Sequence, residues 1–188
     1  DYLAYWLRYH HGAGMVETVL GVGETSERRQ SDLVGFLAAE AAVAVDEQLT
    51  AIGDAYIERA LSSGARLVTV DLDAWTHRFT YPPPGKTTGK LHDQLTTAVD
   101  EPVITIGIGP DFAVMRSDGV RLDIPTMVEE LAAEIAGGGA NGGGHLVVGS
   151  IKFVPGRRDE VITALTAKMA EAPLDADIGT RPQPHSAD

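Results

Sequence analysis

The sequence predicts an α/β domain, a mixed sheet flanked by helices and preceded by a long connector helix. An apolar stripe with helical spacing runs through residues 31–63, which predicts the connector. From residue 65 onward, short apolar runs alternate with helical patterns, and a glycine-rich segment precedes the last apolar run. This alternation is typical of compact α/β domains. We expect the domain to span residues 65–172.

The long helix is predicted from Ser31 to Ser63. Ser31 and Asp32 supply an N-terminal capping signal, and Gly64 stands where a left-handed residue often ends a helix. A helix of roughly 30 residues is about 45 Å long, which suits a connector between two bodies. We therefore interpret residues 31–64 as a connector, 1–30 as an aromatic lead-in that ends or is inserted from a preceding domain, and 173–188 as a disordered tail.

Within the domain, apolar runs and turn residues predict the remaining elements. Pro125 is expected in the first turn of a helix, a position that proline favours. The predicted order is a strand at 66–72, a helix at 87–99, strands at 103–109 and 112–116, a short strand at 120–122, a helix opened by Pro125, a glycine-rich loop at 137–144, a strand at 146–153 and a helix at 157–170.

The glycine-rich segment is the first candidate site. Six of the eight residues from Gly137 to Gly144 are glycine, and His145 follows them. A glycine-rich turn can direct successive N–H groups at one anion and form a nest for phosphate. The apolar run that follows would hold His145 at the rim of a buried strand. The alternative, a flexible surface loop, stays open on composition alone.

The charge distribution bears on the type of ligand. The formal charge of −12 argues against a nucleic-acid partner for the chain as a whole. Residues 65–158, however, carry eleven acids and nine bases, net −2. Arg116 suits a phosphate because its guanidinium can bind bidentately, and Lys86, Lys90 and Lys152 could add point charges. An ion pair between Arg116 and an acid such as Asp118 is the alternative.

Other chemistries are less well supported. Gly85-Lys86-Thr87 is not a P-loop, because Thr80 stands where that motif needs a glycine. Asp71 and Asp73 with His77 could hold a metal, although a polar strand end is the more common outcome for such a pattern. The chain has no cysteine, and no apolar run approaches the roughly 18 residues of a membrane span. We expect a cytoplasmic protein that does not bind membranes.

Three segments resemble a known family. They are Phe112-Ala113-Val114-Met115-Arg116-Ser117, then Val120-Arg121-Leu122-Asp123-Ile124 entering a helix, and then Gly142-Gly143-Gly144-His145 opening a strand. Together they resemble the DHHA1 domain of the DHH phosphoesterases over roughly residues 65–170. The sequence is most similar to the archaeal RecJ-like single-strand exonuclease branch, some of whose members associate with the replication factor GINS.

The resemblance implies where substrate and metal bind. Arg116 and Ser117 would contact the substrate, and Gly142, Gly143, Gly144 and His145 would contact the phosphate being cleaved. In the family, two manganese ions are held by aspartates and histidines of a separate DHH domain, to which residues 1–30 would connect. The Asp-His-His motif is absent here, because Tyr9 precedes His10-His11. We therefore expect no cofactor in this chain, manganese in a domain outside it, and no activity of the chain alone.

The leading hypothesis is the substrate-binding domain of a manganese-dependent exonuclease that acts on single-stranded DNA or RNA, with His145 stabilising charge on the phosphate. Two alternatives stay open. One is a non-catalytic interaction module of a replication complex, with GINS as the kind of partner. The other is a phosphatase that acts on small nucleotides or oligonucleotides with the same scaffold.

Overall fold

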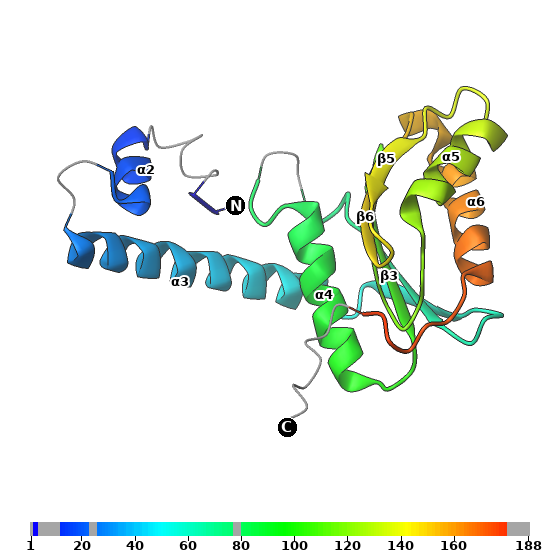
Figure 1. Ribbon diagram of the computed structural model, residues 1–188, viewed down its shortest axis with the longest axis horizontal. Coiled ribbons are helices and arrows are strands. Elements are labelled where there is room, and N and C mark those ends of the chain that lie inside the picture. Colours follow the sequence, from blue (N-terminus) through cyan, green and yellow to red (C-terminus); the bar gives the residue numbers. More distant parts are fainter. Residues whose placement is uncertain (1, 4–11, 23–25, 77–79, 180–188) are drawn as a thin grey trace. The chain divides into compact units, whose positions relative to one another are not determined.

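The computed structural model describes residues 2–3, 12–22, 26–76 and 80–179 (Figure 1). It is a mixed α/β structure with a six-stranded sheet, which confirms the predicted fold class. The chain divides into two compact units. The first comprises residues 1–53 and 75–87, and the second comprises residues 54–74 and 88–188.

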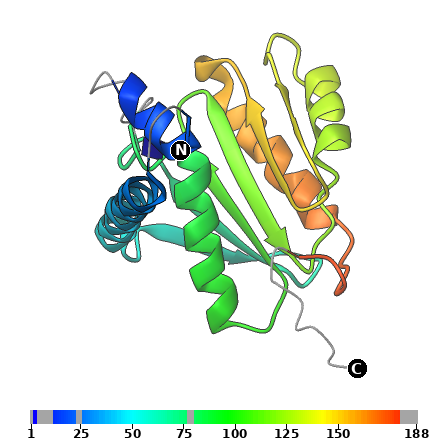
Figure 2. The ribbon, with the colours of Figure 1, turned by 60° about the vertical axis from the view of Figure 1, so that its left-hand side comes forward.

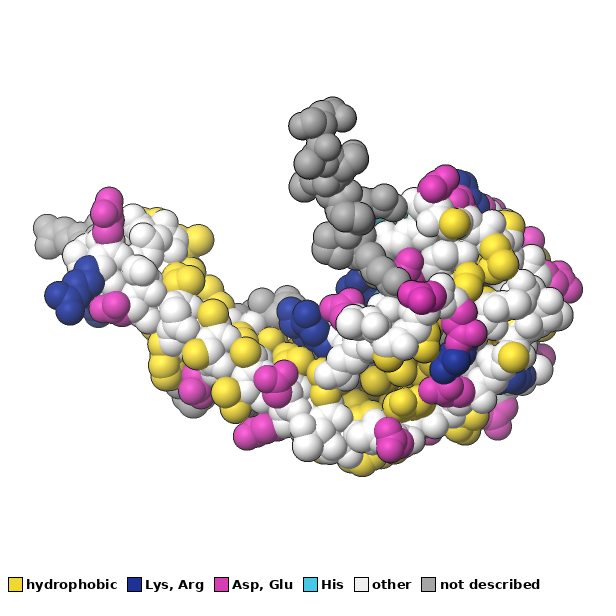
Figure 3. All heavy atoms as spheres, turned by 90° about the horizontal axis from the view of Figure 1, so that it is seen from below, with side chains coloured by type: hydrophobic (Ala, Val, Ile, Leu, Met, Phe, Trp, Pro, Cys, Tyr) yellow, Lys and Arg dark blue, Asp and Glu magenta, His cyan; other side chains and the backbone are white. Residues whose placement is uncertain are grey.

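Two helices characterise the first unit. Helix α2 (Ala13–Leu20) contacts the long helix α3 (Glu27–Ile52). The Ser26 side chain caps α3 by accepting a hydrogen bond from the Arg29 amide. Three side chains of α3 are buried, Leu37, Val45 and Ile52. Three other apolar side chains of α3 are exposed, Val34, Phe36 and Val43. Figure 3 shows hydrophobic side chains on the surface along this helix.

The boundaries predicted for the long helix were wrong at both ends. The helix begins at Glu27, and it ends before Gly53, which has a φ of 49°. Residues Tyr56–Ala60 form strand β1 instead, and Gly64, with a φ of 92°, lies in the hairpin turn that leads to β2 (Arg66–Asp71). Aromatic and β-branched residues at 56 and 57 continue the helical spacing, but they favour strands.

The sheet has the order β1-β2-β3-β4-β6-β5. Strands β2 and β3 (Val103–Ile108) are parallel, and every other neighbouring pair is antiparallel. Helix α4 (Pro84–Ala98) lies between β2 and β3 in the sequence, as a parallel connection requires. The remaining strands are β4 (Phe112–Asp118), β5 (Asn141–Gly144) and β6 (Val148–Lys152).

Each face of the sheet has a different cover, as Figure 2 shows. One face is covered by helices α5 (Ile124–Glu134) and α6 (Arg158–Glu171), and the main core lies between these helices and the sheet. The short 3-10 helix η1 (Pro155–Arg157) directly precedes α6. Residues of that core include Ile104, Ile106, Met115, Leu131 and Leu165. Because side chains alternate along a strand, Thr105 and Arg116 belong to the opposite face. There α4 packs on β3, where His92 Nδ1 lies 2.9 Å from Thr105 Oγ1.

Two smaller predictions have mixed outcomes. Pro125 stands in the first turn of α5, as predicted. The strand predicted at 120–122 is only an isolated bridge between Val120 and Leu174. Residues 173–179 hydrogen-bond back to this segment, since the Gly119 amide donates to the Ile178 carbonyl at 2.8 Å. The predicted disordered tail therefore does not begin at residue 173, and residues 180–188 lie outside the described part of the chain.

Candidate functional site

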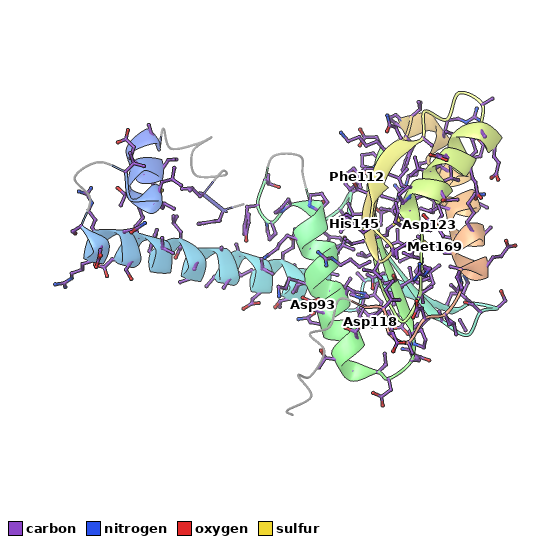
Figure 4. All side chains as sticks on the ribbon, viewed as in Figure 1. Asp93, Phe112, Asp118, Asp123, His145 and Met169 are labelled. Atoms are coloured by element: carbon purple, nitrogen blue, oxygen red, sulfur yellow. The ribbon has the colours of Figure 1, made fainter. Side chains whose placement is uncertain are left out.

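Arg116 and His145 lie on neighbouring parts of one face of the sheet. Arg116 is the register partner of Val148 on β6. The His145 amide donates to the Val148 carbonyl at 2.7 Å, which extends the β5–β6 pairing by one residue. Directly opposed residues of an antiparallel pair share a face, so Arg116, Val148 and His145 are on the same side. Figure 4 shows Phe112 and His145 on one side of the sheet and Met169 of α6 on the other.

The Arg116 side chain is held against helix α4. A β-carbon added at Gly89 would lie 2.8 Å from Arg116 Nε and 3.1 Å from its Cζ. The guanidinium therefore packs against the helix backbone at a position that has no side chain. Arg116 is partly buried, and its register partner on β3 is Thr105, which contacts His92. This packing restricts the rotamers of a long side chain and so preorganises its charge.

The glycine-rich segment forms a strand, not the predicted loop. Positive φ occurs at Gly137 and Gly139, upstream of β5, whereas Gly142 to Gly144 pair with β6. A β-carbon at Gly142 or Gly144 would collide with the carbonyl oxygen of Ser150 or Val148, respectively. A β-carbon at Gly143 would meet nothing within 4 Å. The glycines thus permit a close approach of two strands, and residues 142–144 do not form the phosphate nest that was predicted for the glycine-rich segment.

Strand β5 still offers amide donors, by a different geometry. It is the terminal strand of the described sheet. The His145 amide points toward β6, and amide direction alternates along an antiparallel strand. The amides of Gly142 and Gly144 are therefore directed away from β6. Terminal strands present such N–H groups to other molecules.

The three predicted lysines differ in position. Lys152 is exposed on β6, opposite Phe112 on β4 and Asn141 on β5, and so shares the face of Arg116. Lys90 is exposed on α4, with its Nζ 3.2 Å from an Asp93 oxygen. Lys86 is exposed in the first turn of α4. Of the three, Lys152 is the one that the strand register brings together with Arg116.

Ser117 does not take part in this face. Its side chain is fully buried on the core side of β4, and its hydroxyl donates to the Val120 carbonyl at 2.7 Å. The predicted contact between Ser117 and substrate is therefore wrong for the side chain. The alternation of a strand explains the result, since neighbours such as Arg116 and Ser117 point to opposite faces.

Gly89 and Phe112 belong to this face, but neither was proposed as a site residue from the sequence. An isolated glycine within a helical pattern was an available signal, because it lowers helix stability and often has a packing reason. The partner that gives Gly89 its role, Arg116, is 27 positions away in the sequence, so the contact itself required the fold.

The metal-binding alternatives find little support in the described residues. Within residues 2–3, 12–22, 26–76 and 80–179, no three His, Asp or Glu side chains are grouped so as to hold a metal ion. Asp71 instead forms an ion pair with Arg158 at 2.7 Å and accepts a hydrogen bond from the Asp73 amide. His77 and the pair His10-His11 lie outside the described residues. In the same part of the chain, no helix has the length and apolar character needed to cross a bilayer.

Comparison with known proteins identifies the relatives. No family model matches the chain. The chain is 38% identical over 169 residues to the uncharacterized protein MJ1198 of Methanocaldococcus jannaschii, covering 86% of this chain and 22% of that protein. A solved structure of the PF0399 DHH domain, described as a member of a family of ribosomal proteins, matches with a TM-score of 0.79 and 32% identity. That match covers 92% of this chain and 40% of the other.

The chain resembles proteins with a DHH domain. Structures of RecJ from Thermus thermophilus, one in complex with Mg²⁺ and one with Mn²⁺, share the fold of this chain. Both match with a TM-score of 0.51 and 15% identity, and they cover 85% and 92% of this chain. The chain spans 23% and 24% of those structures. The predicted resemblance to a RecJ-like DHHA1 domain is confirmed.

Proposed function

We propose that this chain binds single-stranded nucleic acid and positions one phosphodiester for hydrolysis. The observation that supports the proposal is the placement of Arg116 and His145 on one face, joined through Val148. A guanidinium, an imidazole and the outward amides of β5 are all donors that suit phosphate oxygens. The similarity to a DHH domain and to the RecJ fold supports an association with phosphoesterases.

Each group has a separate part in the proposal. Arg116 binds a phosphate bidentately and fixes the position of the bound nucleic-acid strand. Lys152 adds a point charge on the same face. His145 stands at the exposed turn between β5 and β6, where its ring can donate to the phosphate that is cleaved. A placed donor contributes to catalysis when it stabilises the charge that develops in the transition state.

Hydrolysis itself is proposed for a longer protein. The chain spans less than half the length of each of these relatives, and the RecJ structures are complexes with Mg²⁺ and Mn²⁺. The described residues do not fit a metal site of their own. We therefore propose that a manganese-dependent centre elsewhere in the polypeptide carries out the reaction, and that this chain supplies substrate recognition.

Binding to the full-length protein tests the proposal. We expect a single-stranded oligonucleotide to bind more tightly than the same sequence as a duplex, measured by fluorescence anisotropy with EDTA present. Arg116→Gln should weaken the single-strand affinity about tenfold and reduce the salt slope by roughly 0.7, as expected for one lost phosphate contact. Arg59→Gln is the matched control, because Arg59 is exposed on β1 and its register partner Leu67 belongs to the core face. Equal effects of the two variants, or no single-strand binding, would contradict the proposal.

A further inference from the structure

Phe112 is an aromatic side chain held at the edge of the Arg116 face. It begins β4 directly after the turn from β3, and the Gly109 amide donates to the Phe112 carbonyl at 2.9 Å. A β-carbon at Gly109 would overlap the Phe112 ring. The ring therefore packs against the bare α-carbon of Gly109, and this contact restricts its orientation.

The rest of the ring faces the same side as the basic residues. Phe112 is partly buried, and alternation along β4 places it on the face of Arg116. Its register partner on β6 is the exposed Lys152. Arg116 is four residues further along β4, roughly 13 Å away. An aromatic ring thus lies beside one cation and in line with another.

We propose that Phe112 stacks against one nucleobase of the strand whose phosphates contact Arg116 and Lys152. The inference rests on the proposed function and names a base-binding position within it. A base exposes its π-face only when it is unpaired, so such a contact favours single strands over duplexes. Every base has a π-face, so the contact tolerates any sequence.

Affinity measurements with abasic oligonucleotides test the stacking contact. The full-length protein is titrated with single strands that each carry one abasic position, again with EDTA. We expect one abasic position to weaken wild-type binding about tenfold, the scale of a lost stacking contact. Phe112→Leu, which keeps an apolar side chain, should weaken binding of the intact strand by a similar factor and should be insensitive to that abasic position. An equal loss for Phe112→Leu and wild type at every abasic position would overturn the inference.

A crosslinking measurement on the wild-type protein tests the stacking contact without relying on the correct folding of Phe112→Leu. A single strand containing 5-iodouracil, irradiated in the complex, should crosslink to Phe112 as mapped by mass spectrometry of the peptides. Crosslinks only at other residues would overturn the inference. If Arg116→Gln weakens binding while Phe112→Leu binds like wild type, the stacking contact is refuted and the proposed function stands. If the wild type binds no single strand, both are refuted.

Discussion

Gly89 of α4 and Arg116 of β4 occupy complementary positions, because the missing side chain of one makes room for the guanidinium of the other. A β-carbon at Gly89 would lie 2.8 Å from Arg116 Nε. Glycine within a helix costs about 1 kcal/mol relative to alanine. Helix α4 thus has lower intrinsic stability at a position where the extra space accommodates a charged group on the face of the sheet opposite the main core.

Gly89→Ala should therefore separate stability from binding. We expect the free energy of unfolding to stay equal or rise by up to about 1 kcal/mol, because alanine favours the helix. The affinity for single strands should fall toward that of Arg116→Gln, because the guanidinium is displaced. Urea unfolding and anisotropy titrations measure the two quantities. Gly85→Ala is the control in the same helix, since a β-carbon there meets nothing within 4 Å. Wild-type affinity in Gly89→Ala would refute a positioning role for Gly89.

The glycines of β5 should differ in their tolerance of substitution. Gly144→Ala places a methyl group against the Val148 carbonyl and the Gly149 backbone, whereas Gly143→Ala places it in open space. We expect Gly144→Ala to lower the free energy of unfolding by about 1–3 kcal/mol, the usual range for overpacking, and Gly143→Ala to change it by less than about 0.5 kcal/mol. Thermal and urea unfolding test this. Equal effects would mean that the β5–β6 approach is not as close as described.

Ser117 should affect stability and leave binding unchanged. Its buried hydroxyl donates to the Val120 carbonyl at 2.7 Å. Ser117→Ala removes that hydrogen bond, and we expect a loss of about 1–2 kcal/mol in the free energy of unfolding. The single-strand affinity of the folded protein should equal that of the wild type. A large loss of affinity with unchanged stability would restore Ser117 as a substrate contact.

The ion pair between Asp71 and Arg158 gives a pH-dependent prediction. Burial raises the pKa of Asp71, but the hydrogen bonds from Arg158 and the Asp73 amide and the charge of Arg158 outweigh it and lower the pKa below 3.8. The stabilisation is therefore present above 3.8 and is lost as the pH falls through the folded-state value. Asp71→Asn should lower the free energy of unfolding at neutral pH by roughly 0.2–1 kcal/mol, since the pair is exposed. Urea unfolding at several pH values tests this, and a difference that persists unchanged into acid would contradict it.

The sequence was sufficient to predict the order of most elements and the resemblance to DHH-domain proteins, but not the pairing of the strands. Apolar runs located β2, β3 and β4, and Pro125 located the start of α5. Glycine composition could not distinguish a loop from a strand at 141–144, because glycine is compatible with both conformations. The role of those glycines depends on how closely β6 approaches.

The site was predictable in part for the same reason. The motifs pointed to Arg116 and His145, which the register brings onto one face. They also pointed to Ser117, but its side chain is buried on the core face, opposite to that of Arg116. Residue types alone could not reveal that Phe112 packs on Gly109 or that Arg116 packs on Gly89, because these contacts depend on tertiary structure.

Substitution of His145 in the full-length protein tests the central claim most directly. The measurement compares single-turnover hydrolysis of a saturating single strand in the presence of Mn²⁺ with the affinity for the same strand. For His145→Ala, we predict a loss of about 100-fold or more in rate, the scale of one removed transition-state donor, with less than about threefold change in affinity. Lys152→Ala should show the reverse, weaker binding with the saturated rate retained. Equal losses of rate and affinity in His145→Ala would contradict the account.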